Sequence, residues 1–261
     1  MTTSPVREYR TVVQDSGDPG YVNRLLIGTA TTGLVHIKWV QARYGQIIPT
    51  NWSMVNMLQF MNSYMPLRYQ VADAQNLIVK EAIEHDFEWL FLLEHDVILP
   101  PDGFIRINEY IREKRHPIVS GLYYTRSVPS EPLLYRGRGT SFVTGWNLGD
   151  KVWCDGVPTG CLLIHMGIIR EMWKESEEYS LNGIKTRRVF NTPNNIWIDP
   201  QTGTFNTMSG TSDLDWCTKV IQGDYFAKAG WGEYQNMKWP MLVDTNIFCK
   251  HINMNGQEFP L

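Results

Sequence analysis

The stretch FLLEHDVILP, residues 91–100, decides how the surrounding sequence can fold. It continues a run of five apolar residues, WLFLL at 89–93, and a short apolar run of this kind is typical of a strand buried on both faces. Two carboxylates, Glu94 and Asp96, follow directly. If the chain turns after the strand, both can face one divalent cation, because hard cations prefer carboxylate oxygens. The simpler alternative is that acidic residues begin an ordinary loop.

Short apolar runs alternate with amphipathic segments on both sides of this stretch. Strands are expected at 24–30, 68–71, 89–93 and 118–123, and helices at 50–65, from Asp73 onward and from Pro100 onward. Alternation of strands and helices favours a parallel sheet, since parallel neighbours need crossover connections. We therefore predict an α/β fold with a mostly parallel central sheet flanked by helices.

The second half of the sequence predicts less regular structure. Pro, Gly and Tyr are frequent at 127–158, and 174–211 is polar and rich in Asn, Thr and Gly, so it is expected to be irregular. Regular elements are expected as a strand at 161–165, a helix at 168–173, a helix from Ser212 and a strand at 241–243. No linker separates the halves. We predict one domain with an N-terminal arm at 1–22, a first half at 23–125 and a loop-rich second half at 126–261.

The composition is that of an ordinary globular protein, with 43% apolar residues, 20% charged residues and a formal net charge of -3. Proteins that bind nucleic acids usually carry a basic face, so no nucleic-acid partner is expected. The four cysteines form no CxxC pair, which favours buried thiols in a reducing compartment. The N-terminus has no apolar signal core, and no apolar run approaches the roughly 20 residues of a membrane span. A cytoplasmic protein without a transmembrane segment is therefore expected.

The block VADAQNLIVKEAIEHDFEWLFLLEHDVILPPDGF, residues 71–104, resembles the GT-A glycosyltransferases, especially their family-2-like group. In that group, a helix with an Ala-Arg-Asn type motif leads to a strand that ends in a DxD-type motif, followed by Pro and a helix. The corresponding motifs here are DAQN at 73–76 and EHD at 94–96. Gln75 stands where the group usually has Arg, so a cation at this place would have to come from elsewhere, with Arg68 and Arg126 as candidates.

The resemblance implies a metal-dependent transferase that takes a sugar from a nucleotide-diphospho-sugar. Glu94, Asp96 and His251 would hold Mn²⁺ or Mg²⁺, and an imidazole ligand suits Mn²⁺ better. Asp96 is the firmer of the two carboxylates because Glu94 replaces the usual first Asp of the motif. His95 is expected to point away, toward the edge of the sheet.

The resemblance also implies an acidic helix start downstream, and the chain has SDLDWC at 212–217. Asp213 and Asp215 lie about 200° apart on a helix, so they cannot share a role. Ser212 and Asp215 have the spacing of a capping box, which leaves Asp213 as the general base that deprotonates an acceptor hydroxyl. The alternative role for Asp213 is favourable negative charge at a helix N-terminus.

Five further residues are candidates for binding the nucleotide-sugar. Thr29 and Thr31 follow the expected first strand, which ends in Gly28 and so allows close approach. Asp73 and Asn76 are carried over from the matching helix start, although Asp73 could instead cap that helix. Gly160, before the strand at 161–165, would let backbone approach a sugar or phosphate, or could form a plain turn.

We therefore predict a glycosyltransferase that moves a sugar from a UDP- or GDP-sugar to a carbohydrate or other hydroxyl acceptor, with inversion if Asp213 is the base. One alternative is a nucleotidyltransferase, but its basic phosphate loop is missing, since the first cation after the segment 28–33 is Lys38. The other alternative is a non-catalytic protein that binds carbohydrate or nucleotide-sugar, which the Gln75 departure favours.

Overall fold

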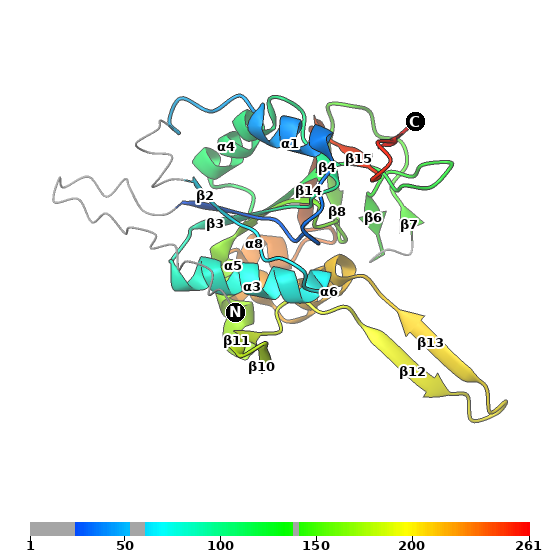
Figure 1. Cartoon of the computed structure of the whole chain (residues 1–261). Coiled ribbons are helices and arrows are strands. Elements are labelled where there is room, and N and C mark those ends of the chain that lie inside the picture. Colours follow the sequence, from blue (N-terminus) through cyan, green and yellow to red (C-terminus); the bar gives the residue numbers. More distant parts are fainter. Residues whose placement is uncertain (1–23, 53–60, 138–140) are drawn as a thin grey trace.

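The computed structural model describes residues 24–52, 61–137 and 141–261, and the arm at 1–22 lies outside them. Its centre is a seven-stranded sheet with the strand order β2-β1-β3-β9-β5-β14-β8 (Figure 1). These strands are β1 (Leu25–Gly28), β2 (Met61–Tyr64), β3 (Trp89–Leu93), β5 (Ile118–Leu122), β8 (Lys151–Cys154), β9 (Cys161–His165) and β14 (Met241–Phe248).

Five of the seven strands run in the same direction, and β8 and β9 run against them. The predicted α/β fold with a mostly parallel central sheet is confirmed. The antiparallel strand β9 lies between β3 and β5. Its amino end therefore meets the carboxyl ends of β3 and β5, and this edge of the sheet gathers the residues that were expected to form a site.

Helices cover both faces of the sheet (Figure 1). The structure has α1 (Ile37–Tyr44), α3 (Val71–Glu84), α4 (Gly103–Glu113), α5 (Met166–Glu175), α6 (Ser212–Gln222), α7 (Tyr225–Lys228) and α8 (Gly232–Gln235). On one face, Trp39 of α1 and Phe104 of α4 pack in a common core with Phe91. On the other face, the helices from α3 and α5 to α8 share a core with Leu90 of the same strand.

All five residues of β3 are buried, as the continuous apolar run predicted. Trp89, Phe91 and Leu93 join the core under α1 and α4, whereas Leu90 and Leu92 join the opposite core. Burying each large apolar side chain contributes about 1.5–3 kcal/mol. The cores on both faces of the sheet therefore depend on β3. The backbone position of Glu94, the residue after β3, is fixed by this packing.

The helix expected at 50–65 and the strand expected at 68–71 are wrong where the structure describes them. Met61–Tyr64 is the edge strand β2, which pairs in parallel with β1, and residues 53–60 lie outside the described part. Arg68 has a left-handed φ of 66°, which ends extended structure, and α3 begins at Val71 rather than Asp73. Pairing with β1, which no local pattern reveals, decides the conformation of 61–64.

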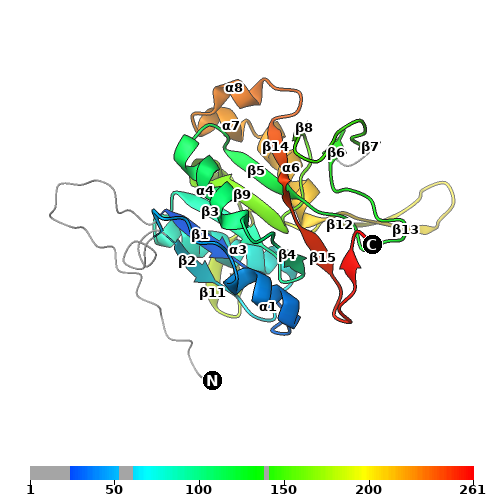
Figure 2. The same ribbon diagram turned by 90° about the horizontal axis from the view of Figure 1, so that it is seen from above.

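The segment 174–211 was expected to be irregular, but it contains two antiparallel hairpins. The first pairs β10 (Glu178–Leu181) with β11 (Ile184–Arg187), and Asn182 and Gly183 at its turn both have positive φ. Asn-Gly is the preferred sequence of such a two-residue turn, so this hairpin had a local signal. The second pairs β12 (Asn194–Ile198) with β13 (Phe205–Ser209) and projects from the body of the protein (Figure 2).

Short strands complete the structure: β4 (Val97–Ile98), β6 (Tyr135–Arg136), β7 (Ser141–Phe142), β15 (Lys250–Ile252) and β16 (Glu258–Phe259). All four cysteines are buried free thiols, as predicted. Within the described ranges, no helix combines the length and the apolar character that crossing a membrane requires.

The close approach of α3 to β1 leads to a testable prediction. A Cβ on Gly28 would lie 2.2 Å from Cγ2 of Ile78 in α3. Gly28→Ala should therefore lower the free energy of unfolding by about 1–3 kcal/mol, and Ile78→Ala by about 2–5 kcal/mol. In denaturant titrations, the double variant should lose less free energy of unfolding than the two single variants lose together, because Ile78→Ala opens space for the methyl group added at Gly28. Gly232→Ala is the control, since its Cβ would meet nothing within 4 Å; additive losses would contradict the prediction.

Candidate functional site

The EHD turn is held at the edge of the sheet by the C-terminal part of the chain. Directly after Asp96, the chain forms β4, which pairs with β15 so that His251 lies opposite Val97. The backbone N–H of Ile252 donates to the carbonyl of Asp96 at 2.8 Å. Two segments that lie far apart in sequence are thus joined at the turn, and His251 is brought next to Asp96.

Asp96 and His251 face one another across the turn. Oδ2 of Asp96 lies 3.3 Å from Nε2 of His251, and Nδ1 of His251 lies 2.9 Å from the carbonyl oxygen of Tyr124. Because Nδ1 donates to that carbonyl, Nε2 is the ring atom that is left to bind a cation once it has lost its proton. Burial alone would raise the pKa of Asp96, but the hydrogen bond and charge of His251, together with Arg126, hold it below its usual value. Asp96 is therefore ionised at neutral pH.

Arg126 supplies a second positive charge to Asp96. Its Nη1 lies 3.0 Å from Oδ2, the same oxygen that faces His251. Oδ1 of Asp96 is buried and has no hydrogen-bond partner among the described residues. Of the two cations considered as substitutes for the missing Arg, Arg126 forms an ion pair with Asp96 at the turn, whereas the backbone N–H of Arg68 donates to the Thr31 carbonyl at 3.1 Å. The carboxylate thus keeps one oxygen for a further partner.

Glu94 is held by a chain of two hydrogen bonds from α3. Nε2 of Gln75 donates to Oγ1 of Thr159 at 3.0 Å, and Thr159 donates to Oε1 of Glu94 at 3.0 Å. Burial, followed by the negative charges of Asp96 and Asp213, raises the pKa of Glu94 to about 7, although Thr159 and His251 oppose the shift. The neutral amide of Gln75 therefore helps to position Glu94 through Thr159. In the glycosyltransferases that the motif resembles, an Arg usually stands at the position of Gln75.

Asp213 joins the same region from the N-terminus of α6. Its negative charge raises the pKa of Glu94 and of the buried Tyr123 hydroxyl, so its carboxylate lies within electrostatic reach of both. Burial raises the pKa of Asp213 itself, against hydrogen bonds from Thr211 and the Leu214 backbone. Three carboxylates, two from the turn that follows β3 and one from the start of α6, are thus brought together.

The predicted capping box at this helix is wrong. Thr211, not Ser212, is the N-cap residue, and no side-chain cap bond forms. Asp215 pairs with Lys219 one turn further along, with 2.7 Å between Oδ2 and Nζ. The reason is that the helix begins at Ser212, one residue earlier than the capping-box spacing requires. The separation of Asp213 from Asp215 still holds, because Asp215 is engaged in this ion pair.

The two threonines after β1 lie at the same edge of the sheet as the EHD turn. Thr29 is fully buried with a hydroxyl that has no partner among the described residues, and Thr31 accepts a hydrogen bond from the Gly33 backbone at 3.1 Å. Nδ1 of His95 lies 3.0 Å from the carbonyl oxygen of Ala30. His95 therefore links the EHD turn to the end of β1 and faces the sheet edge rather than His251.

Asn76 and Asp73 have protein partners that explain them without a ligand. The amide of Asn76 donates to the Phe190 carbonyl at 2.9 Å and accepts from the Phe190 N–H at 2.8 Å. The hydroxyl of Tyr179 donates to Asp73 at 2.8 Å and accepts from Asn76. The helix N-cap is Gln70, so Asp73 does not cap the helix. Both residues fix the segment around 179–190 onto α3.

Gly160 is required by packing inside the protein. Its N–H donates to the Tyr123 hydroxyl at 2.8 Å, and a Cβ at this position would lie 2.3 Å from that oxygen and 2.8 Å from Cγ2 of Val97. Its carbonyl accepts from the N–H of Glu94 at 3.0 Å. Tyr123 and Thr159 were both missed in the sequence; the only local signal was that Thr159 directly precedes a glycine and a buried strand.

The expected three-residue metal site is not formed as such. In the parts of the chain that the structure describes, no group of three or more His, Cys, Asp or Glu side chains is arranged to hold a metal. Asp96 and His251 face one another, while Glu94 is turned to Thr159. A carboxylate with a free oxygen and an imidazole nitrogen nevertheless fit a divalent cation that takes its other ligands from phosphate and water, as Mg²⁺ often does.

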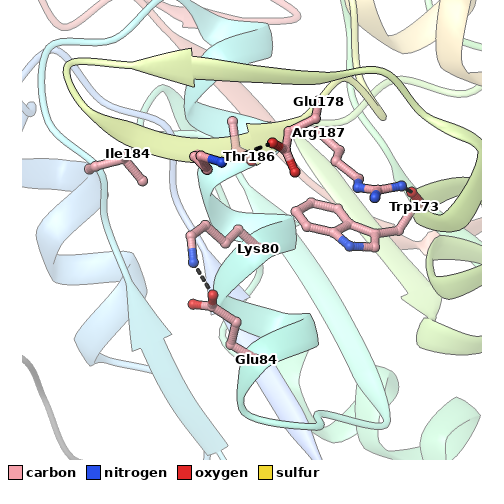
Figure 3. A pocket seen from close by; sticks show the side chains of 8 residues that line it. Lys80, Glu84, Trp173, Glu178, Ile184, Thr186 and Arg187 are labelled. Carbon is pink, nitrogen blue, oxygen red and sulfur yellow. Dashed lines mark hydrogen bonds and ion pairs between the residues drawn. The ribbon is translucent and has the colours of Figure 1, made fainter.

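A hollow of about 510 Å³ lies elsewhere, where the β10–β11 hairpin meets the second half of α3 (Figure 3). Its charged side chains are paired within the protein. Lys80 pairs with Glu84, Lys185 lies 3.4 Å from Glu178, and Arg187 donates to carbonyl groups at the end of α5. None of the expected site residues lines this hollow, and its paired charges give no reason to place the chemistry there.

Comparison with known proteins shows the fold. No protein-family model matches the sequence, and no curated protein matches it. Among solved structures, A197 from STIV is similar with a TM-score of 0.52 at 12% identity, over 90% of this chain and 92% of that chain. The two proteins therefore share a fold over nearly their whole lengths.

More distant likenesses cover about half of the chain. S. aureus TarS 1–349, solved in complex with UDP, has a TM-score of 0.35 at 8% identity, over 57% of this chain and 48% of its own. A putative glucose-1-phosphate thymidylyltransferase from Bacillus anthracis, solved with sucrose, has a TM-score of 0.32 at 11% identity, over 57% and 74%. Likenesses this remote support no inference about the activity of this chain.

The raised pKa of Glu94 predicts how stability depends on pH. The folded protein holds this proton up to about pH 7, whereas an unfolded glutamate releases it near 4.5. The free energy of unfolding should therefore fall as pH rises through this window. Glu94→Gln, which keeps an acceptor for Thr159, should be more stable than the unchanged protein at pH 8 by up to about 3 kcal/mol, and no more stable at pH 4.

The measurement is urea unfolding at both pH values in buffer with a chelator, so that no cation neutralises the site. The control is Glu109→Gln, which replaces an exposed glutamate of α4. A Glu94→Gln effect that is the same at both pH values, or that matches the control, would contradict the assigned cause.

Proposed function

We propose that this protein is a metal-dependent glycosyltransferase that moves a sugar from a nucleotide-diphospho-sugar to an acceptor hydroxyl. The observation that carries the proposal is an ionised Asp96 that faces His251, lies in the same cluster as Asp213 and has one buried oxygen without a partner among the described residues. This cluster occupies the carboxyl edge of the parallel strands, where α/β sheets commonly bind ligands. Fold alone does not assign a reaction, so the proposal depends on these side chains.

Asp96 and His251 are the residues that would hold Mn²⁺ or Mg²⁺. A divalent cation at this place would neutralise the diphosphate leaving group as its bond to the sugar breaks. Oδ1 of Asp96 and Nε2 of His251 are the two atoms suited to this contact, because Oδ1 has no described partner and Nδ1 is bound to the Tyr124 carbonyl. Glu94 lies beside them and is positioned by Thr159 rather than by the cation.

Asp213 is the proposed general base. A carboxylate whose pKa is raised by burial takes up a proton more readily at neutral pH than an ordinary aspartate does. It would remove the proton from the acceptor hydroxyl as the hydroxyl attacks the sugar, and direct displacement of this kind inverts the anomeric carbon. Thr29 and Thr31, at the same edge, remain the proposed contacts to the nucleotide. Gly160, Asp73 and Asn76 are assigned the structural roles that their partners within the protein indicate.

Replacement of Asp96 tests the metal and diphosphate contact. Asp96→Asn should weaken UDP binding in the presence of Mn²⁺ by at least about tenfold, because the cation loses a charged ligand. Isothermal titration calorimetry with UDP and with GDP, with and without Mn²⁺, measures this. Asp86→Asn is a matched control, since Asp86 is 83% exposed in its side chain and has a left-handed φ that Asn tolerates. Metal-dependent binding that survives in Asp96→Asn would refute the site.

Replacement of Asp213 separates chemistry from binding. Asp213→Asn should slow release of UDP or GDP from a panel of nucleotide-sugars by about 10²–10⁴-fold, while the affinity for nucleotide with Mn²⁺ changes little. Asp215→Asn, on the same first turn of α6 but paired with Lys219, should keep its turnover. If the unchanged protein binds nucleotide with metal yet releases none from any donor, the non-catalytic alternative is correct instead.

A further inference from the structure

Arg126 and His251 contact the same oxygen of Asp96. Nη1 of Arg126 lies 3.0 Å from Oδ2 and Nε2 of His251 lies 3.3 Å from it, while Oδ1 is buried and has no described partner. Within the described residues, this ion pair is the single hydrogen bond of the Arg126 guanidinium, a group with five N–H donors. Most of its hydrogen-bonding capacity is therefore free for a ligand.

The backbone around Arg126 is held while its side chain remains accessible. The preceding residue, Thr125, donates its N–H to the Glu131 carbonyl at 2.9 Å and accepts from the Glu131 N–H through its hydroxyl at 3.0 Å. The guanidinium side chain itself is 47% exposed. The side chain can thus change partner by rotation about its own bonds, without rearrangement of the loop that carries it.

The net charge around Asp96 would change when a nucleotide-sugar donor and its cation bind. Without ligand, Glu94, Asp96 and Asp213 lie together, and Arg126 offsets part of their negative charge. A divalent cation at Asp96 would repel a guanidinium that contacts the same carboxylate, because like charges about 4 Å apart repel one another, with solvent weakening the effect at the half-exposed Arg126. A diphosphate arriving with the cation offers that guanidinium a better, bidentate partner.

We propose that Arg126 is the counter-ion of Asp96 in the ligand-free protein and transfers to the diphosphate of the donor when the cation and the donor bind. The inference rests on the proposed function, since it requires a diphosphate at this edge of the sheet. It assigns to Arg126 two roles with opposite effects. Arg126 competes with a cation that binds alone, and it strengthens the binding of a diphosphate that binds with the cation.

The test compares Arg126→Gln with the unchanged protein for two ligands. Mn²⁺ alone, followed by electron paramagnetic resonance of the free ion, should bind about two- to fivefold more tightly to the variant, because an exposed competing ion pair is lost. UDP at saturating Mn²⁺, followed by calorimetry, should bind about tenfold more weakly, because a charge-assisted contact is lost. Arg126→Lys keeps the charge but not the bidentate fork, so it should recover part of the UDP affinity.

Arg106→Gln is the matched control, since it also breaks an Arg–Asp ion pair, the one with Asp102 at 2.7 Å on the exposed side of α4. It should change neither affinity. If the role of Arg126 were purely structural, Arg126→Gln would bind both Mn²⁺ and UDP more weakly and would have a lower melting temperature. This result would overturn the inference, and so would unchanged affinities for both ligands. If the unchanged protein binds neither Mn²⁺ nor UDP with Mn²⁺, the proposed function fails as well; if it binds both and only the opposite shifts are missing, the role of Arg126 alone fails.

Discussion

The pairing of β3 with β9 is the constraint on which the rest of the structure depends. Leu93 lies opposite Cys161, and the N–H of Glu94 continues the ladder to the Gly160 carbonyl at 3.0 Å. Because β9 runs against β3, the residues just before β9 meet the residues just after β3. This one pairing closes the centre of the sheet, places Thr159 against Glu94 and leaves space at Gly160 for the Tyr123 hydroxyl.

The site that results is electrostatically costly. Three carboxylates share a partly buried region, and the protein accommodates them in two ways. Asp96 is ionised and contacts both Arg126 and His251, whereas burial raises the pKa of Glu94 and of Asp213. Groups with pKa values pushed in opposite directions are a common property of active sites, although ion-pair networks with structural roles show it too. Here one oxygen of Asp96 has no partner in the described part of the chain, which favours a site for a ligand.

The limits of the sequence are clear at particular residues. The strand β3, the carboxylates after it and the helix that carries Asp213 were all predicted from local patterns. The partners of those carboxylates were not, because Thr159, Tyr123 and the tautomer of His251 depend on contacts between distant segments. Asn76 shows the reverse case: a motif suggested a ligand contact, whereas the structure gives its buried amide partners in the Phe190 backbone and the Tyr179 hydroxyl, which lie in a different part of the sequence.

By itself, the sequence determined the α/β class, the buried central strand and the acidic turn that ends it, because the spacing of apolar residues over short stretches reflects burial and backbone preference. Only the tertiary structure decided which of the charged residues meet. The antiparallel insertion of β9, the pairing of β15 with β4 and the packing of α3 bring His251, Arg126 and Gln75 to the turn at Glu94 and Asp96. Strand order and helix packing determine such contacts, and no local sequence pattern around these residues predicts either of them.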